Sequence, residues 1–167
     1  MITVNEAEQI ILSHQKDYGT EMLPFLAAQG RILAENILAD RDFPPYNRVT
    51  MDGIAIRYAD YEAGCRSFPI ALTQAAGDAP PTDLAPNTCI EIMTGAACSA
   101  VVDTVIPYEH LQMANGVANI LENPVVFGKN IHLQGSDRAQ GDIVIHAGQR
   151  VGAAQINVAA SVGKSEL

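Results

Sequence analysis

Residues 44–53 read Pro-Pro-Tyr-Asn-Arg-Val-Thr-Met-Asp-Gly, and they mark the sharpest change of character along the chain. Two consecutive prolines force extended backbone and remove two hydrogen-bond donors, so any regular element must end before them. The Asp52-Gly53 pair that closes the stretch is typical of a turn. From here to about Gly135, short apolar runs alternate with glycine, proline, asparagine and aspartate. The stretch therefore predicts the start of a β-rich module.

Three short runs in this region have the composition of strands. They lie at Phe68 to Leu72, at Cys89 to Met93 and at Thr104 to Tyr108. Asn115-Gly116 lies between two further apolar segments and is the strongest short hairpin signal in the chain. Strands at this spacing, with no long helices between them, predict a small and mainly antiparallel β module.

The sequence before the prolines is helical in character. Thr3-Val4-Asn5-Glu6 has the pattern of a capping box, which predicts a helix that runs to about His14. A second, short helical stretch is expected over Phe25 to Gln29, where Gly30 supplies a left-handed end.

The sequence after the β module resumes a mixed pattern. Ile143 to Ile145 predicts a strand, and Ala153 to Val162 predicts a helix that ends at the following glycine. Neither flank has enough apolar surface to be stable alone, so the two are expected to pack together. The fold class is therefore mixed α+β and elongated overall: residues 1–42 with 138–167 form a helix/strand domain, into which a β-rich domain of residues 43–137 is inserted.

Composition excludes several classes of protein. The 167 residues are 48% apolar and carry a formal net charge of −9, with 19 acidic and 10 basic side chains. So acidic a chain without a basic run is expected to bind neither nucleic acid nor anionic membranes. No apolar run is long enough to span a bilayer, and the first residues lack a secretory signal. Three cysteines without a Cys-x-x-Cys pair indicate a reduced, cytoplasmic setting.

Three polar segments are candidates for chemistry, and each has a plain structural alternative. Asp52-Gly53 is a carboxylate after a rigid loop, or an ordinary turn. Thr94-Gly95 presents a hydroxyl and a backbone amide to an anion, or simply ends a strand. Residues 129–138 gather a lysine, a histidine, an aspartate and an arginine around a glycine, or form a solvated loop. Phosphate-binding glycine loops, nucleophile elbows and metal-ligand spacings are absent from the sequence.

The order of the segments is more specific than any one of them. Residues 30–36 resemble the "GRVLAED" stretch of the molybdopterin molybdenumtransferase family, which includes MoeA and the gephyrin E domain. Residues 44–57 resemble its "PPFDNSAMDGYAVR" signature, and residues 76–96 resemble "AGxPxxxxLxPGEAVRIMTGA". Residues 128–137 are similar to "GxNIRxxGED", and residues 141–148 to "GxxLLxxGxxL". The match is collinear over nearly the whole chain.

This resemblance implies a function in molybdenum-cofactor biosynthesis. Members of the family insert molybdate into adenylylated molybdopterin with help from Mg²⁺, as cytoplasmic homodimers whose site lies in a cleft between subunits. The chain would be the first two domains of such an enzyme and would form one wall of that cleft. The longer protein is then expected to be a molybdopterin molybdotransferase, whereas the residues leave open whether this chain alone catalyses anything and whether the metal is molybdenum or tungsten.

Carried over by position, the resemblance assigns site residues. The residues expected to act in catalysis are Asp52, Thr94 and Asp137. The substrate-binding residues would be Gly53, Gly95, His132 and Arg138. Asp52 and Asp137 would lie near Mg²⁺ or molybdate, and the Gly95 amide would donate to the same anion.

The sequence departs from the family strings at three places, and the altered signature loop with His132 leaves an alternative function open. Residues 47–50, Asn-Arg-Val-Thr, replace "DNSA", and His132 stands where the family has arginine. Residues 97–100, Ala-Cys-Ser-Ala, replace "PxPxGA". These changes are also compatible with a diverged, non-catalytic module for binding, scaffolding and dimerisation.

Overall fold

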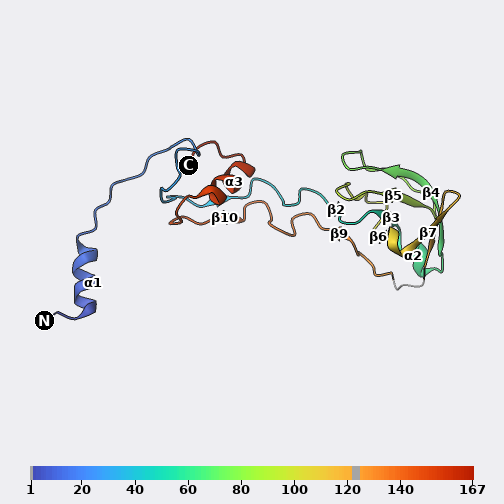
Figure 1. Cartoon of the computed structure of the whole chain (residues 1–167), viewed down its shortest axis with the longest axis horizontal. Helices are drawn as coiled ribbons and strands as arrows, with labels where there is room; N and C mark the ends of the chain where they lie inside the picture. Colours follow the sequence, from blue (N-terminus) through green and yellow to red (C-terminus); the bar gives the residue numbers. More distant parts are fainter. Residues whose placement is uncertain (1, 122–124) are drawn as a thin grey trace. The chain divides into compact units, whose positions relative to one another are not determined.

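The chain folds as two compact units. The computed structural model describes residues 2–121 and 125–167 (Figure 1). Unit 1 comprises Met1–Ile37 with Ile145–Leu167, and unit 2 comprises Leu38–Val144. The short strands β1, Ile37–Leu38, and β10, Ile143–Ile145, form a two-stranded sheet.

Unit 1 begins with helix α1, Val4–Ser13, and the predicted capping box is confirmed. The Thr3 amide donates to Glu6 Oε2 over 2.7 Å, and the Glu6 amide donates to Thr3 Oγ1 over 3.2 Å. Two amides at the helix start are thereby satisfied. No residue of α1 is buried, so the cap is the main local contribution to its stability.

The helix predicted over Phe25 to Gln29 is wrong. The segment forms turns, with the Ala28 amide donating to the carbonyl of Phe25 over 3.3 Å. Gly30 does adopt the expected left-handed conformation, with φ of +86°, and its amide donates to the Val151 carbonyl over 2.7 Å. Because the Gly30 amide bonds to the distant Val151 carbonyl, helical hydrogen bonding does not continue beyond this turn.

The C-terminal part of unit 1 follows its prediction. Helix α3 runs over Ala153–Ser161, and Gly163 after it has φ of +77°. Among the helices that the structure describes, none is long and apolar enough to cross a membrane.

Unit 2 is built on a six-stranded sheet with the order β6-β3-β5-β4-β8-β7. All neighbouring strands are antiparallel except β4 and β5, which are parallel. This agrees with the mixed α+β, mainly antiparallel fold expected from the sequence. The strands are β3, Gly53–Ile56; β4, Ser67–Gln74; β5, Cys89–Ile92; β6, Thr104–Pro107; β7, Leu111–Ala114; and β8, Val117–Ile120.

Local signals account for the edge of this sheet and its connections. The predicted hairpin is confirmed, because Asn115 and Gly116 both have positive φ, 50° and 75°, between β7 and β8. Helix α2, Tyr58–Glu62, follows β3, and a 3₁₀ turn, Tyr108–His110, separates β6 from β7.

The sheet is covered on both faces, which explains why β3 is buried along its full length. One hydrophobic cluster contains Ala55 of β3 and Ile90 of β5. The other contains Ile54 of β3 and Phe68 of β4. Alternate residues of a strand point to opposite faces of the sheet, so each cluster contains the strand residues that point to one face.

A second, two-stranded sheet brings three distant segments together. Strand β2, Arg48–Val49, pairs antiparallel with β9, Ile131–His132. On its other side, Arg48 pairs with Ala97 in an isolated antiparallel bridge. The signature loop of residues 44–53 therefore lies between the Thr94-Gly95 turn and the polar segment of residues 129–138.

Candidate functional site

Asp52 is positioned by the glycine that follows it. Gly53 pairs with Ile92 of β5 on one side and with Pro107 of β6 on the other. A Cβ on Gly53 would lie 2.0 Å from the carbonyl oxygen of Ile106, closer than atoms can approach. Only glycine allows β6 to come this close. The role seen for Gly53 is thus to place Asp52 at the start of a central strand.

The carboxylate of Asp52 is held by Thr94. Both the Thr94 amide and the Thr94 hydroxyl donate to Asp52 Oδ1, each over 2.6 Å. The hydroxyl bond first, and then the amide bond, lowers the pKa of Asp52 below its ordinary value. Both side chains are exposed, and no described residue donates to Asp52 Oδ2. Asp52 is therefore an ionised carboxylate with one oxygen fixed and one oxygen open.

The Thr94-Gly95 turn does not offer its amides to a ligand. The Thr94 amide is used by Asp52, and the Gly95 amide donates to the Val49 carbonyl over 2.9 Å. Gly95 has φ of +90°, and a Cβ there would lie 3.5 Å from Ala76 Cβ. In this structure Gly95 shapes the turn that carries Thr94, in contrast to the anion donor expected from the sequence.

A second pair forms on the other side of β2. His132 Nε2 lies 2.9 Å from Asp137 Oδ1, with the imidazole about one-third exposed. The loop between them is fixed, because the Gln134 amide donates to Asn47 Oδ1 and the Asp137 amide donates to the Phe43 carbonyl, each over 2.9 Å. Asn47, one of the departures from the family string, thus has a defined structural contact.

Arg138 is exposed beside this second pair. Its guanidinium Nη1 donates to the carbonyl of Asp137 over 2.8 Å. Its amide donates to the Phe43 carbonyl over 3.2 Å, so the backbone here is tied to the start of the signature loop. The guanidinium of Arg138 is therefore held by the backbone of Asp137.

The structure thus brings the predicted residues together as two pairs, Asp52 with Thr94 and His132 with Asp137. Among the described residues, no hydrogen bond or ion pair joins one pair to the other. Both are linked to the strand β2 segment, since the Thr50 amide donates to the Asn130 carbonyl over 3.0 Å and the Val49 amide to the Ala96 carbonyl over 3.0 Å.

A divalent cation suits the donors that are present at Asp52. No group of three or more histidine, cysteine, aspartate or glutamate side chains that could hold a metal occurs within residues 2–121 and 125–167. Mg²⁺ does not need such a cage, because it is usually held by one or two carboxylates together with water and substrate phosphates. The open Oδ2 of Asp52 fits that mode.

Sequence reasoning missed Tyr108 and Glu91, which lie close to Asp52. The Tyr108 amide donates to the Asp52 carbonyl over 3.1 Å, and the Tyr108 hydroxyl donates to Glu91 Oε1 over 2.8 Å. Burial, then the hydrogen bond and charge of Glu91, then the charge of Asp52, raise the pKa of Tyr108 to about 12. Glu91 lies within the stretch of residues 76–96 that resembles a family string, but no pattern there indicates its contact with Tyr108, so only the strand register reveals this pair.

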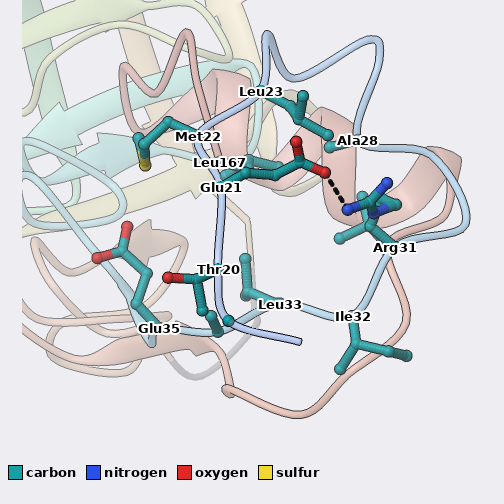
Figure 2. A pocket seen from close by; sticks show the side chains of 13 residues that line it. Thr20, Glu21, Met22, Leu23, Ala28, Arg31, Ile32, Leu33, Glu35 and Leu167 are labelled. Atoms are coloured by element: carbon teal, nitrogen blue, oxygen red, sulfur yellow. Dashed lines mark hydrogen bonds and ion pairs between the residues drawn. The ribbon is translucent and has the colours of Figure 1, made fainter. Parts of the chain in front are cut away.

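Unit 1 contains a cavity of its own, of about 390 Å³. Figure 2 shows Glu21 paired with Arg31 beside an apolar wall that includes Leu23, Leu33 and Leu167. The site residues expected from the sequence all belong to unit 2, and none of them lines this cavity.

Comparison with known proteins agrees with the resemblance read from the motifs. The family described as "MoeA N-terminal region (domain I and II)" matches residues 2–163. A molybdopterin molybdenumtransferase of Synechocystis is 36% identical over 170 residues, covering 100% of this chain and 43% of that protein. Molybdopterin molybdenumtransferase 2 of Mycobacterium tuberculosis is 30% identical, covering 100% of this chain and 42% of its own length.

Solved structures give the same result. Two crystal structures of the molybdopterin biosynthesis MoeA protein of Pyrococcus horikoshii superpose with TM-scores of 0.79 and 0.86, at 28% and 26% identity. They cover 99% and 98% of this chain, and 43% and 44% of the Pyrococcus chains. The chain therefore spans less than half the length of the relatives it matches. With residues 2–163 matched by the family and this fold shared, the chain belongs to the MoeA N-terminal region family of molybdenum-cofactor biosynthesis.

Proposed function

We propose that this chain is the N-terminal part of a molybdopterin molybdotransferase that inserts molybdate into adenylylated molybdopterin. The observation that carries the proposal is the Asp52 carboxylate, which is fixed on Oδ1 by two donors of Thr94 and open on Oδ2. A fixed, ionised carboxylate with a free oxygen can bind a metal ion or repel an anion along a defined direction.

Asp52 would act on the phosphate end of the substrate. Its depressed pKa keeps it charged, and Oδ2 would hold Mg²⁺ beside the pyrophosphate oxygens. When bound, Mg²⁺ would supply positive charge to the leaving AMP. Thr94 would set the direction of the carboxylate, since both of its donors point to the same oxygen.

Asp137, His132 and Arg138 would act on the oxyanion. Asp137 contacts the imidazole of His132 and fixes the orientation of the ring. Arg138, whose guanidinium donates to the Asp137 carbonyl, carries a permanent positive charge. Arg138 would attract molybdate, the imidazole of His132 would offer a hydrogen bond to it, and Asp137 would limit where it binds.

The remainder of the active site is proposed to come from elsewhere. The relatives are more than twice as long as the match, and the pterin would be bound by a further domain of a partner subunit in a cytoplasmic homodimer. This chain would then contribute one wall of a cleft between subunits, and it would have no activity alone.

A chimera tests the proposal. Residues 1–167 replace the matching 43% of the Synechocystis molybdenumtransferase, and the chimera is expressed in a bacterium that lacks its own molybdenumtransferase. Molybdoenzyme activity is the readout, with this chain alone as a parallel sample. We expect the chimera to restore activity, the chain alone to be inactive, and Asp52→Asn and Asp137→Asn to reduce the restored activity at least about tenfold.

Two results contradict the proposal. Restoration by the chain alone would show that no further domain is needed. A chimera that folds and dimerises in light scattering, yet neither binds adenylylated molybdopterin nor restores activity, would favour the scaffolding alternative that residues 47–50 and His132 suggest.

A further inference from the structure

The pairing register places polar side chains on the face of the sheet that bears Ile54. Thr73 of β4 pairs with Glu91 of β5, Glu91 pairs with Ile54 of β3, and Ile54 pairs with Ile106 of β6. Residues that pair across strands point to the same face, as do residues two apart along a strand. Thr73 and Glu91 therefore share the face of Ile54, and Tyr108, just after the end of β6, packs against the cluster of Ile54 and donates to Glu91.

Hydrogen bonds connect these side chains across four strands. The Thr73 hydroxyl donates to Glu91 Oε2 and the Tyr108 hydroxyl donates to Glu91 Oε1, each over 2.8 Å. Tyr108 follows β6 while Glu91 lies on β5, and β3 runs between them. The Tyr108 side chain therefore reaches across β3, immediately beside Asp52. We call Thr73, Glu91 and Tyr108 the brace.

The brace ends on the backbone of Asp52. The amide of Tyr108 donates to the Asp52 carbonyl over 3.1 Å, so one residue holds Asp52 with its main chain and Glu91 with its side chain. The Tyr108 ring packs against the cluster that contains Ile54 and Ile106.

We propose that Glu91 and Tyr108 are positioning residues for Asp52, which keep its carboxylate on the two donors of Thr94. Neither touches the substrate. The use of the positioned carboxylate rests on the proposed function, but the positioning itself is a property of this chain. Without the brace, the backbone at Asp52 and Gly53 gains freedom, and the two hydrogen bonds from Thr94 lengthen.

The direction of change in the pKa of Asp52 tests this proposal. Carbon-13 NMR titration of the Asp52 carboxyl is measured in the full 167-residue chain. Tyr108→Phe removes one hydroxyl without changing a charge, and we expect it to raise the pKa of Asp52 toward the ordinary value, because hydrogen bonds to the carboxylate weaken. Tyr61→Phe is the matched control: Tyr61 packs against the same cluster, and its hydroxyl has no hydrogen-bond partner among the described residues.

Two variants of Glu91 separate position from charge. Loss of the negative charge alone lowers the pKa of a neighbouring carboxyl, whereas loss of positioning raises it. Glu91→Ala removes charge and acceptor together, and we expect the pKa of Asp52 to be higher in this variant than in Glu91→Gln. Glu91→Gln removes the charge but keeps an acceptor for the Tyr108 hydroxyl, so this conservative variant should leave the pKa unchanged or lower.

The outcomes decide the proposal in either direction. An unchanged Asp52 titration in a folded Tyr108→Phe chain, or a pKa of Asp52 no higher in Glu91→Ala than in Glu91→Gln, would overturn it. Should Tyr108→Phe not fold, Thr73→Val removes only the far end of the brace, and the proposal is overturned if the pKa of Asp52 is unchanged in Thr73→Val and no higher in Glu91→Ala than in Glu91→Gln.

Activity in the chimera gives a separate readout. We expect Tyr108→Phe to lower kcat about tenfold or more with little change in KM, because a misplaced group costs mainly the chemical step. If the wild-type chimera is inactive while the NMR shifts occur, the proposed function fails and the positioning role stands. If the chimera is active and the NMR shifts do not occur, the positioning role fails alone.

Discussion

Thr94 donates its amide and its hydroxyl to the same oxygen of Asp52, Oδ1, over 2.6 Å in each case. The two residues are 42 positions apart in the sequence, and both lie at ends of neighbouring central strands. A threonine at this position therefore controls both the orientation and the charge of the carboxylate.

Removal of the Thr94 hydroxyl should raise the pKa of Asp52. The amide bond remains in Thr94→Val, so the pKa stays below its ordinary value, while Thr94→Ser should preserve the wild-type titration. A carboxyl with a depressed folded-state pKa adds stability above its unfolded-state pKa and loses it as pH falls through the lowered value. Urea unfolding should thus show Thr94→Val less stable than the wild type at neutral pH, with the difference shrinking in acid.

Thr88→Val is the control for this pH dependence. The Thr88 hydroxyl donates to the Ala85 carbonyl over 2.7 Å, and an amide carbonyl does not titrate. The loss of stability in Thr88→Val should therefore be the same at neutral pH and in acid. Parallel behaviour of the two valine variants would contradict the assignment of the Asp52 pKa to Thr94.

Gly53→Ala should disrupt the central sheet. The added methyl would lie 2.0 Å from the Ile106 carbonyl oxygen, so β3 and β6 must separate, at a cost of about 3 kcal/mol. Gly152→Ala is the matched control, because Gly152 has φ of −120° and its added methyl would meet only the movable Gln155 Oε1 at 3.2 Å. Equal midpoints of thermal unfolding for the two variants would refute the close approach of β3 and β6.

Gln74→Glu should be destabilising in a pH-dependent manner. Gln74 is 1% exposed, its Nε2 donates to the Ala97 carbonyl over 2.9 Å, and its Oε1 has no partner among the described residues. A carboxylate here would be buried and unpaired, at a cost of about 3 kcal/mol. Burial raises the folded-state pKa of such a group, so its protonated form is tolerated in acid and stability falls as pH rises through that raised value.

Comparison of urea midpoints at pH 4 and pH 7 measures this effect. Gln112→Glu on β7 is the control, since Gln112 is exposed and a charge there remains solvated. A Gln74→Glu chain as stable at pH 7 as at pH 4 would mean that this side chain is not buried.

Thr3→Ala should melt helix α1 selectively. The helix has ten residues, none of them buried, and helices of this length are marginal in water without tertiary contacts. Loss of an N-cap threonine costs about 1 kcal/mol. Carbon-13 α shifts of residues 4–13 should move toward coil values, whereas Ser13→Ala, at the other end of the helix, should leave them nearly unchanged.

Local sequence signals predicted those elements that local interactions determine. The capping box at Thr3 and Glu6 and the hairpin at Asn115 and Gly116 depend on contacts within four residues, and both are confirmed. The helix expected over Phe25 to Gln29 failed because hydrogen bonds with the distant residues around Val151 compete with it. Local propensity is a weak guide where such pairing intervenes.

The candidate site was predictable only in part for a similar reason. Asp52, Thr94, His132 and Asp137 were named from motifs, but their grouping into two pairs depends on strand pairing between segments tens of residues apart. The partner of the Gly95 amide, Val49, lies 46 residues away, and no pattern near Gly95 indicates it. Tyr108 and Glu91 become visible only once the register of three strands is known.

The two ends of unit 2 are hydrogen-bonded to each other. The Ala39 amide donates to the Asp142 carbonyl over 2.8 Å, and the Gly141 amide donates back to the Ala39 carbonyl over 2.9 Å. The segment of about one hundred residues between these positions therefore begins and ends at adjacent points. The folding free energy of unit 2 offsets the entropy cost of bringing the two ends of this segment together. Because these ends are adjacent, the residues between Ala39 and Gly141 can be replaced by a foreign domain whose own termini lie close together, or by a short turn. Neither replacement requires a change in the segments of the chain on either side.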